Sequence, residues 1–431
     1  MTKEECIEIP YGKKKLTFNI PGNRLSFVGQ MEPIPPIANF AAELEDSLDH
    51  PIGCKPLAEL LQHKEAVLIL VEDGTRNTPV ARILSVLLPY IEQRVKRDNI
   101  TIMTAPGTHR IMTADEINDK LGRGVVENYH IIQHDYLDES SLRDLGKVRA
   151  GEKEIPIEVN RHALEADFII GLGSIVPHSD AGYSGGGKIV APGICGYSTT
   201  AATHIAAALL EEIPLGRLDN PCRQGIERVA EKVGLDFIVN LVNNSNNEVA
   251  GIYAGDFIKA HRRGAEKSRQ AYGVNIDTPA EIVVVSSFPF DLDWWQADKS
   301  LISASLAVKK RGIIVFLAPC PEGLESNHPG LCKWLPKSYH QACRTARESS
   351  LLHKDLDLIA ADLAITNAKI RERADIFIVT EGLTHQEIEV LGYRPFNSLQ
   401  KAVDCALKIK PAGKVGVLPR GGDCLPVAGS V

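Results

Sequence analysis

Two histidines and a lysine stand in the most glycine-rich stretch of the chain, residues 171 to 204, which contains His178 and Lys188 and ends at His204. Glycine lets the backbone approach a ligand closely and adopt positive φ, but it removes packing side chains, so a segment of this kind is costly to order unless something fills it. The lysine follows three consecutive glycines, Gly185, Gly186 and Gly187. We therefore expect Lys188 to lie against a ligand rather than in solvent.

His109, which follows Pro106-Gly107-Thr108, is a candidate general acid or base. An imidazole with an unperturbed pKa of about 6.5 can take or give a proton at neutral pH. His109 and His178, placed on opposite faces of one carbon or hydroxyl, could serve both stereochemical directions of a reaction. The alternative is that His109 is structural and is held by one backbone hydrogen bond.

The motif Asp73-x-Thr75-Arg76-x-x-Pro79 lies where a predicted strand passes into a predicted helix. Helix N-termini bind anions through their free N–H groups and positive dipole end. The guanidinium of Arg76 adds a planar fork suited to a carboxylate or a phosphate. The alternative is an Asp or Thr N-cap beside a surface arginine.

The histidines match no zinc-binding template, because His178 and His204 have no Cys or carboxylate partner at fixed spacing. A single imidazole makes an exchangeable metal site unless a cofactor supplies the other ligands. His204, in a helix expected from 198 to 210, is therefore a metal ligand only if a cofactor supplies the remaining ligands. Otherwise it is a buried or capping histidine.

A further cluster, Trp294-Trp295-Gln296-Ala297-Asp298-Lys299, is expected after a strand at 281 to 286, in the loop and first turn of a helix expected over 297 to 310. A lysine at a helix N-terminus is unfavourable unless an anion lies nearby, so Lys299 is a candidate anion ligand. The two tryptophans either wall an apolar pocket or pack a domain interface.

The elements that must position these residues alternate between strand and helix. An apolar run at 66 to 71 predicts a parallel strand covered on both faces, and further strands are expected at 100 to 104, 130 to 134 and 167 to 170. This alternation indicates an α/β fold with largely parallel sheets. Ligands of such sheets bind beyond the carboxyl ends of the strands, where three of the polar clusters fall.

Length predicts two domains, because 431 residues exceed one ordinary core. We expect an N-terminal α/β domain over 1–275 that carries the histidines and Lys188, and a smaller α/β domain over 276–410. The tail, 411–431, is expected to return to the first domain. The active site is expected in the cleft between the two domains.

Composition excludes several classes of partner. The net charge of −7 and the lack of a basic run argue against nucleic acid, and no apolar run is long enough to span a membrane. The N-terminus lacks the apolar core of a secretory signal. Nine scattered cysteines without a CxxC pair fit reduced thiols, so we expect a cytoplasmic protein. Its oligomeric state is left open.

In combination, these motifs resemble the nickel-pincer-nucleotide-dependent lactate racemase family, the LarA-like 2-hydroxyacid racemases and epimerases. The resemblance is carried by four motifs in the family's order, and it runs through nearly the whole chain. They are DGTRNTP at 73–79, PGTH at 106–109, PH…GYSGGGKIVAPGICG…H at 177–204 and QADKS at 296–300.

The resemblance implies a cofactor and a set of roles. The cofactor would be a nickel pincer nucleotide, made by dedicated synthesis proteins and attached covalently to Lys188, with His204 completing the nickel ligands and Gly185 to Gly187 close to the flat ring. The implied acid/base pair is His109 and His178. The implied substrate and cofactor contacts are Arg76, Lys299, Gln296 and Trp295 for a small 2-hydroxy acid, and Asp73 and Thr75 near the cofactor or Arg76.

The implied activity is an isomerase reaction that inverts C2 of a 2-hydroxycarboxylic acid by proton-coupled hydride transfer to the cofactor. Such a transfer avoids the enediolate that direct deprotonation would require. One alternative is an oxidoreductase or lyase using the same cofactor. Another is a non-catalytic protein that binds an anionic nucleotide, against which the paired histidines argue.

The sequence departs at two positions from the lactate-specific members of the family. Lactate-specific members of the family carry a tyrosine before the glutamine and a tryptophan late in the second domain. Here Trp295 precedes Gln296, and no tryptophan follows Trp334. A larger or more polar 2-hydroxy acid, such as a sugar acid or a hydroxy-diacid, is at least as consistent with the sequence, and Phe288 and Phe290 are expected to shape the pocket with the tryptophans.

Overall fold

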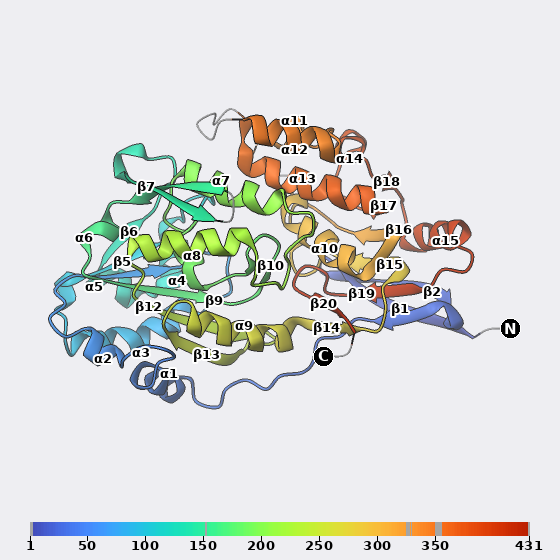
Figure 1. Ribbon diagram of the computed structural model, residues 1–431. Coiled ribbons are helices and arrows are strands. Elements are labelled where there is room, and N and C mark those ends of the chain that lie inside the picture. Colours follow the sequence, from blue (N-terminus) through green and yellow to red (C-terminus); the bar gives the residue numbers. More distant parts are fainter. Residues whose placement is uncertain (1–2, 151–152, 325–327, 329, 350–355, 430–431) are drawn as a thin grey trace. The chain divides into compact units, whose positions relative to one another are not determined.

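The computed structural model describes residues 3–150, 153–324, 328, 330–349 and 356–429. The chain divides into two compact units, each of which has its own sheet (Figure 1). The first unit comprises residues 33–207 and 216–271, and the second comprises residues 1–32, 208–215 and 272–431. The mixed α/β class with large parallel sheets that the sequence predicts is confirmed.

The first unit is built on a six-stranded sheet in the order β13-β12-β9-β4-β5-β6. All neighbouring pairs are parallel except the pair of β12 and β13. The strands are β4 (Val67–Val71), β5 (Ile100–Thr104), β6 (His130–Gln133), β9 (Phe168–Ser174), β12 (Phe237–Asn243) and β13 (Val249–Gly255). Every residue of β4, β9 and β12 is buried, as the apolar runs of central parallel strands require.

The order of this sheet reverses between β4 and β9. From β4 the chain adds β5 and then β6 on one side, whereas β9 and then β12 lie on the other. In a parallel sheet the crevice beyond the carboxyl ends at such a point is where ligands bind. The segments that leave β4, β5 and β9 carry Asp73, His109 and His178 respectively.

Helices pack on the sheet through apolar stripes. Helix α3 (Val80–Glu92) buries Val80, Ile83, Leu84, Leu87 and others at helical spacing against the strands. Other helices of this unit are α1 (Phe40–Asp49), α4 (Ala114–Leu121), α7 (Tyr197–Ala208), α8 (Pro221–Val233) and α9 (Lys259–Tyr272). A hairpin of β7 (Leu142–Ala150) and β8 (Lys153–Asn160) contacts α8.

The second unit has a six-stranded parallel sheet in the order β18-β17-β16-β15-β19-β3. Its strands are β3 (Leu25–Val28), β15 (Ala280–Ser286), β16 (Val308–Leu317), β17 (Ala374–Val379), β18 (Arg394–Pro395) and β19 (Val415–Leu418). Its main helices are α10 (Trp294–Ala307), α13 (Leu358–Arg373) and α15 (Leu399–Ile409). Near the chain's end, β20 (Leu425–Ala428) pairs with β14 (Gly273–Ile276).

The first residues of the chain belong to this second unit. They form a hairpin of β1 (Glu4–Tyr11) and β2 (Lys14–Pro21), and Ile9, Phe18 and Ile20 of this hairpin are buried in the core of the second sheet. Strand β3 then adds to the edge of that sheet beside β19. Chain ends far apart in sequence therefore build one core.

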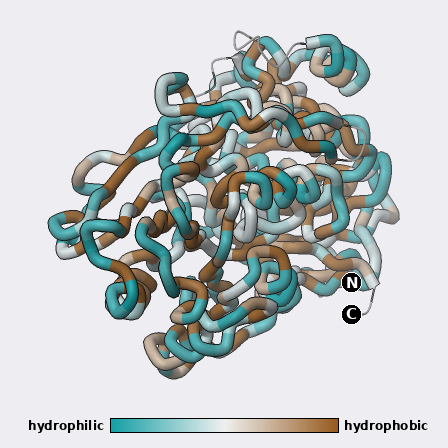
Figure 2. Tube along the Cα trace, turned by 60° about the vertical axis from the view of Figure 1, so that its left-hand side comes forward, coloured by the Kyte–Doolittle hydropathy of each residue, from teal (hydrophilic) through white to brown (hydrophobic). Residues whose placement is uncertain are grey.

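Hydrophobic stretches along the trace are short and interleaved with hydrophilic residues (Figure 2). Among the described residues, no helix combines the length and the apolar character that crossing a membrane would need.

Candidate active site

Asp73 and His109 form a hydrogen-bonded pair beyond the ends of β4 and β5. The Nδ1 atom of His109 lies 2.8 Å from Asp73 Oδ2 and 3.2 Å from Thr75 Oγ1. Because an ionised carboxylate only accepts hydrogen bonds, Nδ1 of His109 carries the proton. The acceptor lone pair of the neutral ring is therefore on Nε2.

The second oxygen of Asp73 holds Thr75. Thr75 donates from its hydroxyl at 2.6 Å and from its backbone N–H at 3.2 Å to Asp73 Oδ1. Burial acts to raise the pKa of Asp73, but His109, Thr75 and Arg76 together outweigh it and lower the pKa to about 2. Asp73 is thus an ionised anchor for His109 at neutral pH. The expected alternative, an Asp or Thr N-cap, is wrong, because α3 begins after Pro79 with no side-chain cap.

Arg76 lies at the edge of a pocket. Its Nη1 donates to Thr75 Oγ1 at 3.0 Å, which ties the guanidinium to the same group as Asp73 and His109. The pocket beside it encloses about 430 Å³. It is lined by Asp73, Gly74, Thr75, Arg76, Asn77, Thr78, Arg110, Met112, Glu116, Asp119 and Lys120.

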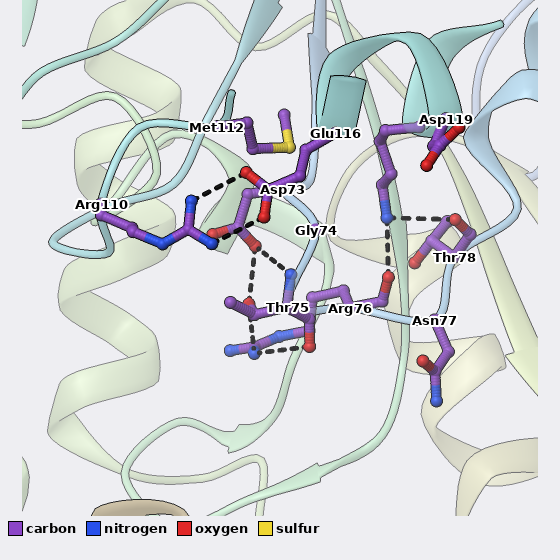
Figure 3. A pocket seen from close by; sticks show the side chains of 11 residues that line it. Asp73, Gly74, Thr75, Arg76, Asn77, Thr78, Arg110, Met112, Glu116 and Asp119 are labelled. Carbon is purple, nitrogen blue, oxygen red and sulfur yellow. Dashed lines mark hydrogen bonds and ion pairs between the residues drawn. The ribbon is translucent and has the colours of Figure 1, made fainter. Parts of the chain in front are cut away.

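The other cations of this pocket are already engaged. Figure 3 shows Arg110 turned toward Glu116, which it contacts through two hydrogen bonds of 2.8 and 2.6 Å. Lys120 donates to the carbonyl oxygens of Arg76 and Thr78 at 2.7 and 3.2 Å, so it fixes the loop rather than offering a charge to a ligand. Arg76 is the lining cation best suited to an incoming carboxylate.

His178 and Lys188 are brought together beyond the end of β9. The Nε2 atom of His178 lies 3.1 Å from Nζ of Lys188. The Nδ1 atom accepts the backbone N–H of Asp180 at 3.2 Å, so the neutral ring carries its proton on Nε2, facing the amine.

The lysine that follows the three glycines is only partly exposed. Burial lowers the pKa of Lys188 to about 8, while Asp180 and Cys222 act to raise it and Arg223 and Arg76 act to lower it further. At pH 7 about a tenth of this amine is uncharged, far more than for an ordinary lysine, and the uncharged form is the one that a nucleophilic amine requires. The contribution of Arg76 shows that the groups after β4 and β9 lie within electrostatic reach of each other.

His204 lies on α7, as the expected helix placed it. Its Nδ1 lies 2.8 Å from the carbonyl oxygen of Thr200, one turn earlier, so Nδ1 donates and Nε2 is the acceptor. A backbone carbonyl that fixes the tautomer in this way is the usual second partner of a metal-binding histidine. A ring nitrogen of His204 and a carboxylate oxygen of Asp180 lie within 4.8 Å of each other.

The three glycines before Lys188 are required by packing within the chain. A Cβ at Gly185 would lie 2.7 Å from Asn240 Oδ1, one at Gly186 would lie 2.9 Å from the ring of His261, and one at Gly187 would lie 2.9 Å from Ala230. Gly185 and Gly186 also have φ of 72° and 59°, which favours glycine. They let the short 3₁₀ turn at Gly186–Ile189 present Lys188.

The loops after β5 and β9 are joined through the backbone. The backbone N–H of Gly107 donates to the carbonyl oxygen of Gly193 at 3.0 Å. Gly107 has a φ of 62°, which favours glycine, and a Cβ at this position would lie 3.5 Å from Pro192. This contact fixes the PGTH turn that presents His109 against the segment that follows Lys188.

The remaining candidates lie in the second unit on α10. Lys299 donates to Gln296 Oε1 at 2.6 Å, and its Nζ lies 4.4 Å from the centroid of the Phe290 ring. Trp295 stacks on His328 with ring centroids 4.5 Å apart and an interplanar angle of 10°. Trp294 is fully buried and packs the core of this unit.

The expected start of this helix at 297 is wrong. Asp293 caps α10 by accepting the backbone N–H of Gln296 at 2.7 Å, so the helix begins at Trp294. Lys299 therefore lies in the second turn rather than at the helix N-terminus. Its Nζ contacts Gln296 and the face of the Phe290 ring.

Several polar residues that sequence reasoning missed support these groups. Glu72, one residue before Asp73, accepts hydrogen bonds from the hydroxyl of Thr78 and the backbone N–H of Ser174, so it ties the end of β4 to that of β9. Burial raises its pKa. Its place directly after an apolar strand was a usable signal. No local sequence pattern points to Arg223, His261 or Asn240, because they contact the segment around residues 181–186 only in the folded chain.

Comparisons with known proteins place both parts of the chain. Residues 11–213 match the Lactate racemase N-terminal domain family, and residues 276–425 match the Lactate racemase C-terminal domain family. The lactate racemase of Thermoanaerobacterium thermosaccharolyticum is 30% identical over 430 residues, which cover 96% of this chain and 97% of that protein. The lactate racemase of Lactiplantibacillus plantarum is 32% identical over 325 residues, 74% of this chain and 76% of that protein.

Solved structures agree with these relationships. The lactate racemase apoprotein from T. thermosaccharolyticum superposes with a TM-score of 0.88 at 29% identity, covering 98% of this chain and all of that one. A Thermotoga maritima protein shares the fold with a TM-score of 0.70 at 24% identity, covering 92% of this chain and 100% of that one.

Proposed function

The chain belongs to the lactate racemase family and is an isomerase of the racemase type, and we propose that it inverts C2 of a 2-hydroxycarboxylic acid with a lysine-bound nickel pincer nucleotide. The observation that carries the proposal is the pairing of two oriented histidines at one sheet edge. His109 is held by Asp73, and His178 is held beside Lys188. A protein that only binds a nucleotide has no need of two such groups.

The residues fit the proposed cofactor. Lys188 offers an amine that is partly uncharged near neutral pH, as covalent attachment requires. His204 offers Nε2 with its tautomer fixed by Thr200, as a metal ligand requires. When bound, the group would supply nickel and an acceptor for the C2 hydrogen as hydride.

The protein's own residues would manage the proton and the carboxylate. Arg76 binds the substrate carboxylate, and its link to Thr75 keeps the guanidinium in place. His109 Nε2 accepts the proton of the 2-hydroxyl, because Asp73 holds the other ring proton and stabilises the resulting imidazolium. His178, whose Nε2 carries the ring proton, would donate that proton to the substrate oxygen on the other face, and the two histidines would exchange these roles for the opposite enantiomer. We also propose Lys299, Gln296 and Trp295 of the second unit as substrate contacts, as the family resemblance implies.

The proposed substrate class is wider than lactate. The pocket beside Arg76 encloses about 430 Å³, and most of the residues that line it are of polar types, with Met112 as the single large apolar side chain among them. A methyl group would fill little of this volume, whereas a longer hydroxylated or acidic chain would fill more of it and could contact these polar side chains. A larger or more polar 2-hydroxy acid therefore fits better.

One isotope experiment separates this function from its alternatives. A 2-hydroxy acid of one configuration, labelled with deuterium at C2, is incubated in ordinary water with the cofactor-loaded protein. Retention of deuterium in the product of opposite configuration is expected, because the C2 hydrogen returns to the same carbon. Washout of the label would indicate direct proton abstraction. Net accumulation of the keto acid would favour the oxidoreductase alternative, and absence of any conversion across a panel would favour the binding protein.

Replacing His204 with alanine is expected to remove nickel while leaving the mass increment at Lys188. The imidazole is the one ligand to nickel that we assign to the protein. Metal analysis after chelator treatment, beside intact mass, measures both quantities. The matched control is His130→Ala, an exposed histidine of the same unit. Full nickel retention in His204→Ala would remove this residue from the metal site.

A further inference from the structure

One buried arginine holds the loop that presents His178 and Lys188. Arg223 lies on α8 and is 0% exposed. Its Nε donates to the carbonyl of Ala181 at 3.1 Å, its Nη1 to that of Gly185 at 3.2 Å, and its Nη2 to that of Tyr183. A fully buried guanidinium is costly unless its donors are satisfied, and here they are used on one short segment.

The carbonyl groups of the 181–185 segment are all occupied from within the chain. Gly216 donates to that of Gly182 at 2.9 Å, and Nε2 of His261 donates to that of Ser184 at 2.8 Å. His261 must donate there, because a carbonyl oxygen only accepts, and Arg262 faces its other ring nitrogen at 3.2 Å. Five successive carbonyls are thus fixed by the core, three of them by Arg223.

The functional side chains lie on either side of this segment. His178, in β10 (Pro177–His178), pairs across a short antiparallel bridge with Gly182 of β11 (Gly182–Tyr183). Lys188 follows three residues after the segment, in the 3₁₀ turn. Any rotation of the 181–185 backbone changes the 3.1 Å separation between His178 Nε2 and Lys188 Nζ.

We propose that Arg223 is the positioning residue of this loop: its fork, supported by His261, holds the 181–185 carbonyls so that Lys188 and His178 stay in contact and out of bulk water. The three acceptors belong to alternate residues of the 181–185 segment, so they require three donors held in fixed positions. A lysine has the same charge but presents donors from a single atom, and it cannot span the three oxygens. The role given to the loop rests on the proposed function.

The test measures the titration of Lys188 in the cofactor-free chain. Trace acetic anhydride labels amines in their neutral form, and peptide mass spectrometry across a pH series gives the midpoint for Lys188. The groups that face this amine are His178, Asp180, Cys222, Arg223 and Arg76. The wild-type midpoint is expected at about 8.

In Arg223→Lys, the cation stays but the fork is lost. The loop relaxes, water reaches the amine, and the midpoint is expected to rise by at least one unit, which lowers the neutral fraction at pH 7 by about tenfold. The control is Arg228→Lys on the same helix, because Arg228 is exposed and donates to the Arg149 carbonyl of the β7–β8 hairpin. Its midpoint is expected to match wild type.

A folded Arg223→Lys protein with an unchanged midpoint overturns the proposal, because it would show that the arginine only stabilises the fold. If that variant does not fold, His261→Phe decides, since it keeps a ring against Gly186 and removes one donor. It is expected to raise the midpoint in the same direction, and no rise would overturn the proposal. If the midpoints shift as expected but wild type shows no C2 inversion, the loop mechanism stands and the racemase function fails.

Discussion

Replacing Lys188 with alanine is expected to abolish covalent attachment of the cofactor completely. Chain co-expressed with a cofactor-synthesis pathway would show a mass increment on the Lys188 peptide and stoichiometric nickel, and both would be absent from the variant. The physical reason is that this amine has a pKa of about 8, so it reacts near neutral pH, where ordinary lysines are almost fully protonated. Intact-protein mass and metal analysis measure the outcome.

The matched control for Lys188→Ala is Lys232→Ala, an exposed lysine of α8, which is expected to load normally. An increment that persists in Lys188→Ala would mean that another nucleophile holds the group. No increment in wild type, when a loaded homologue is obtained in parallel, would leave the family relationship without the chemistry and would favour anion binding as the function.

Replacing either oriented histidine with glutamine is expected to lower kcat by about 10² to 10⁴, the usual contribution of a general acid or base. Both His109→Gln and His178→Gln should impair conversion in both directions, since inversion needs one proton carrier for each face. Cofactor loading is expected to persist in His109→Gln, because His109 contacts Asp73 and Thr75 rather than Lys188. Chiral chromatography starting from each enantiomer measures the rates.

The control for this pair is His162→Gln, which removes a histidine that is hydrogen-bonded to Glu165 in α6 (His162–Glu165) and lies outside both groups. The His162→Gln variant is expected to have the kcat of wild type in both directions. A loaded His109→Gln or His178→Gln protein with wild-type kcat would remove that residue from proton exchange and would return it to the structural role that a lone histidine most often has.

Local patterns in the sequence determined the strands and the position of the site along them. The apolar run at 67–71 indicates a central strand, because residues buried on both faces of a parallel sheet are nearly all apolar. Polar residues directly after such strands then had to lie at the carboxyl edge. Asp73, His109 and His178 could therefore be grouped before any contact was known.

Boundaries set by capping were less well determined. Helix α10 begins at Trp294 rather than at the expected residue 297, because the side chain of Asp293 accepts the backbone N–H of Gln296 and so caps the N-terminus of the helix. The sequence predicts that a helix follows the strand, but it does not determine which polar side chain accepts hydrogen bonds from the first backbone N–H groups of that helix. This moved Lys299 from the first turn of the helix to the second.

Only the tertiary structure decided what holds the site together. Arg223 contacts carbonyls 38 to 42 residues away, and Glu72 reaches Ser174 across two strands that are neighbours only because the sheet order reverses there. Strand β3 near the start of the chain likewise joins a sheet whose other strands begin at Ala280. Local periodicity reflects which face of an element is buried. The partner of a buried charge depends instead on which distant segments the fold brings together, and that information is not carried by any one stretch of sequence.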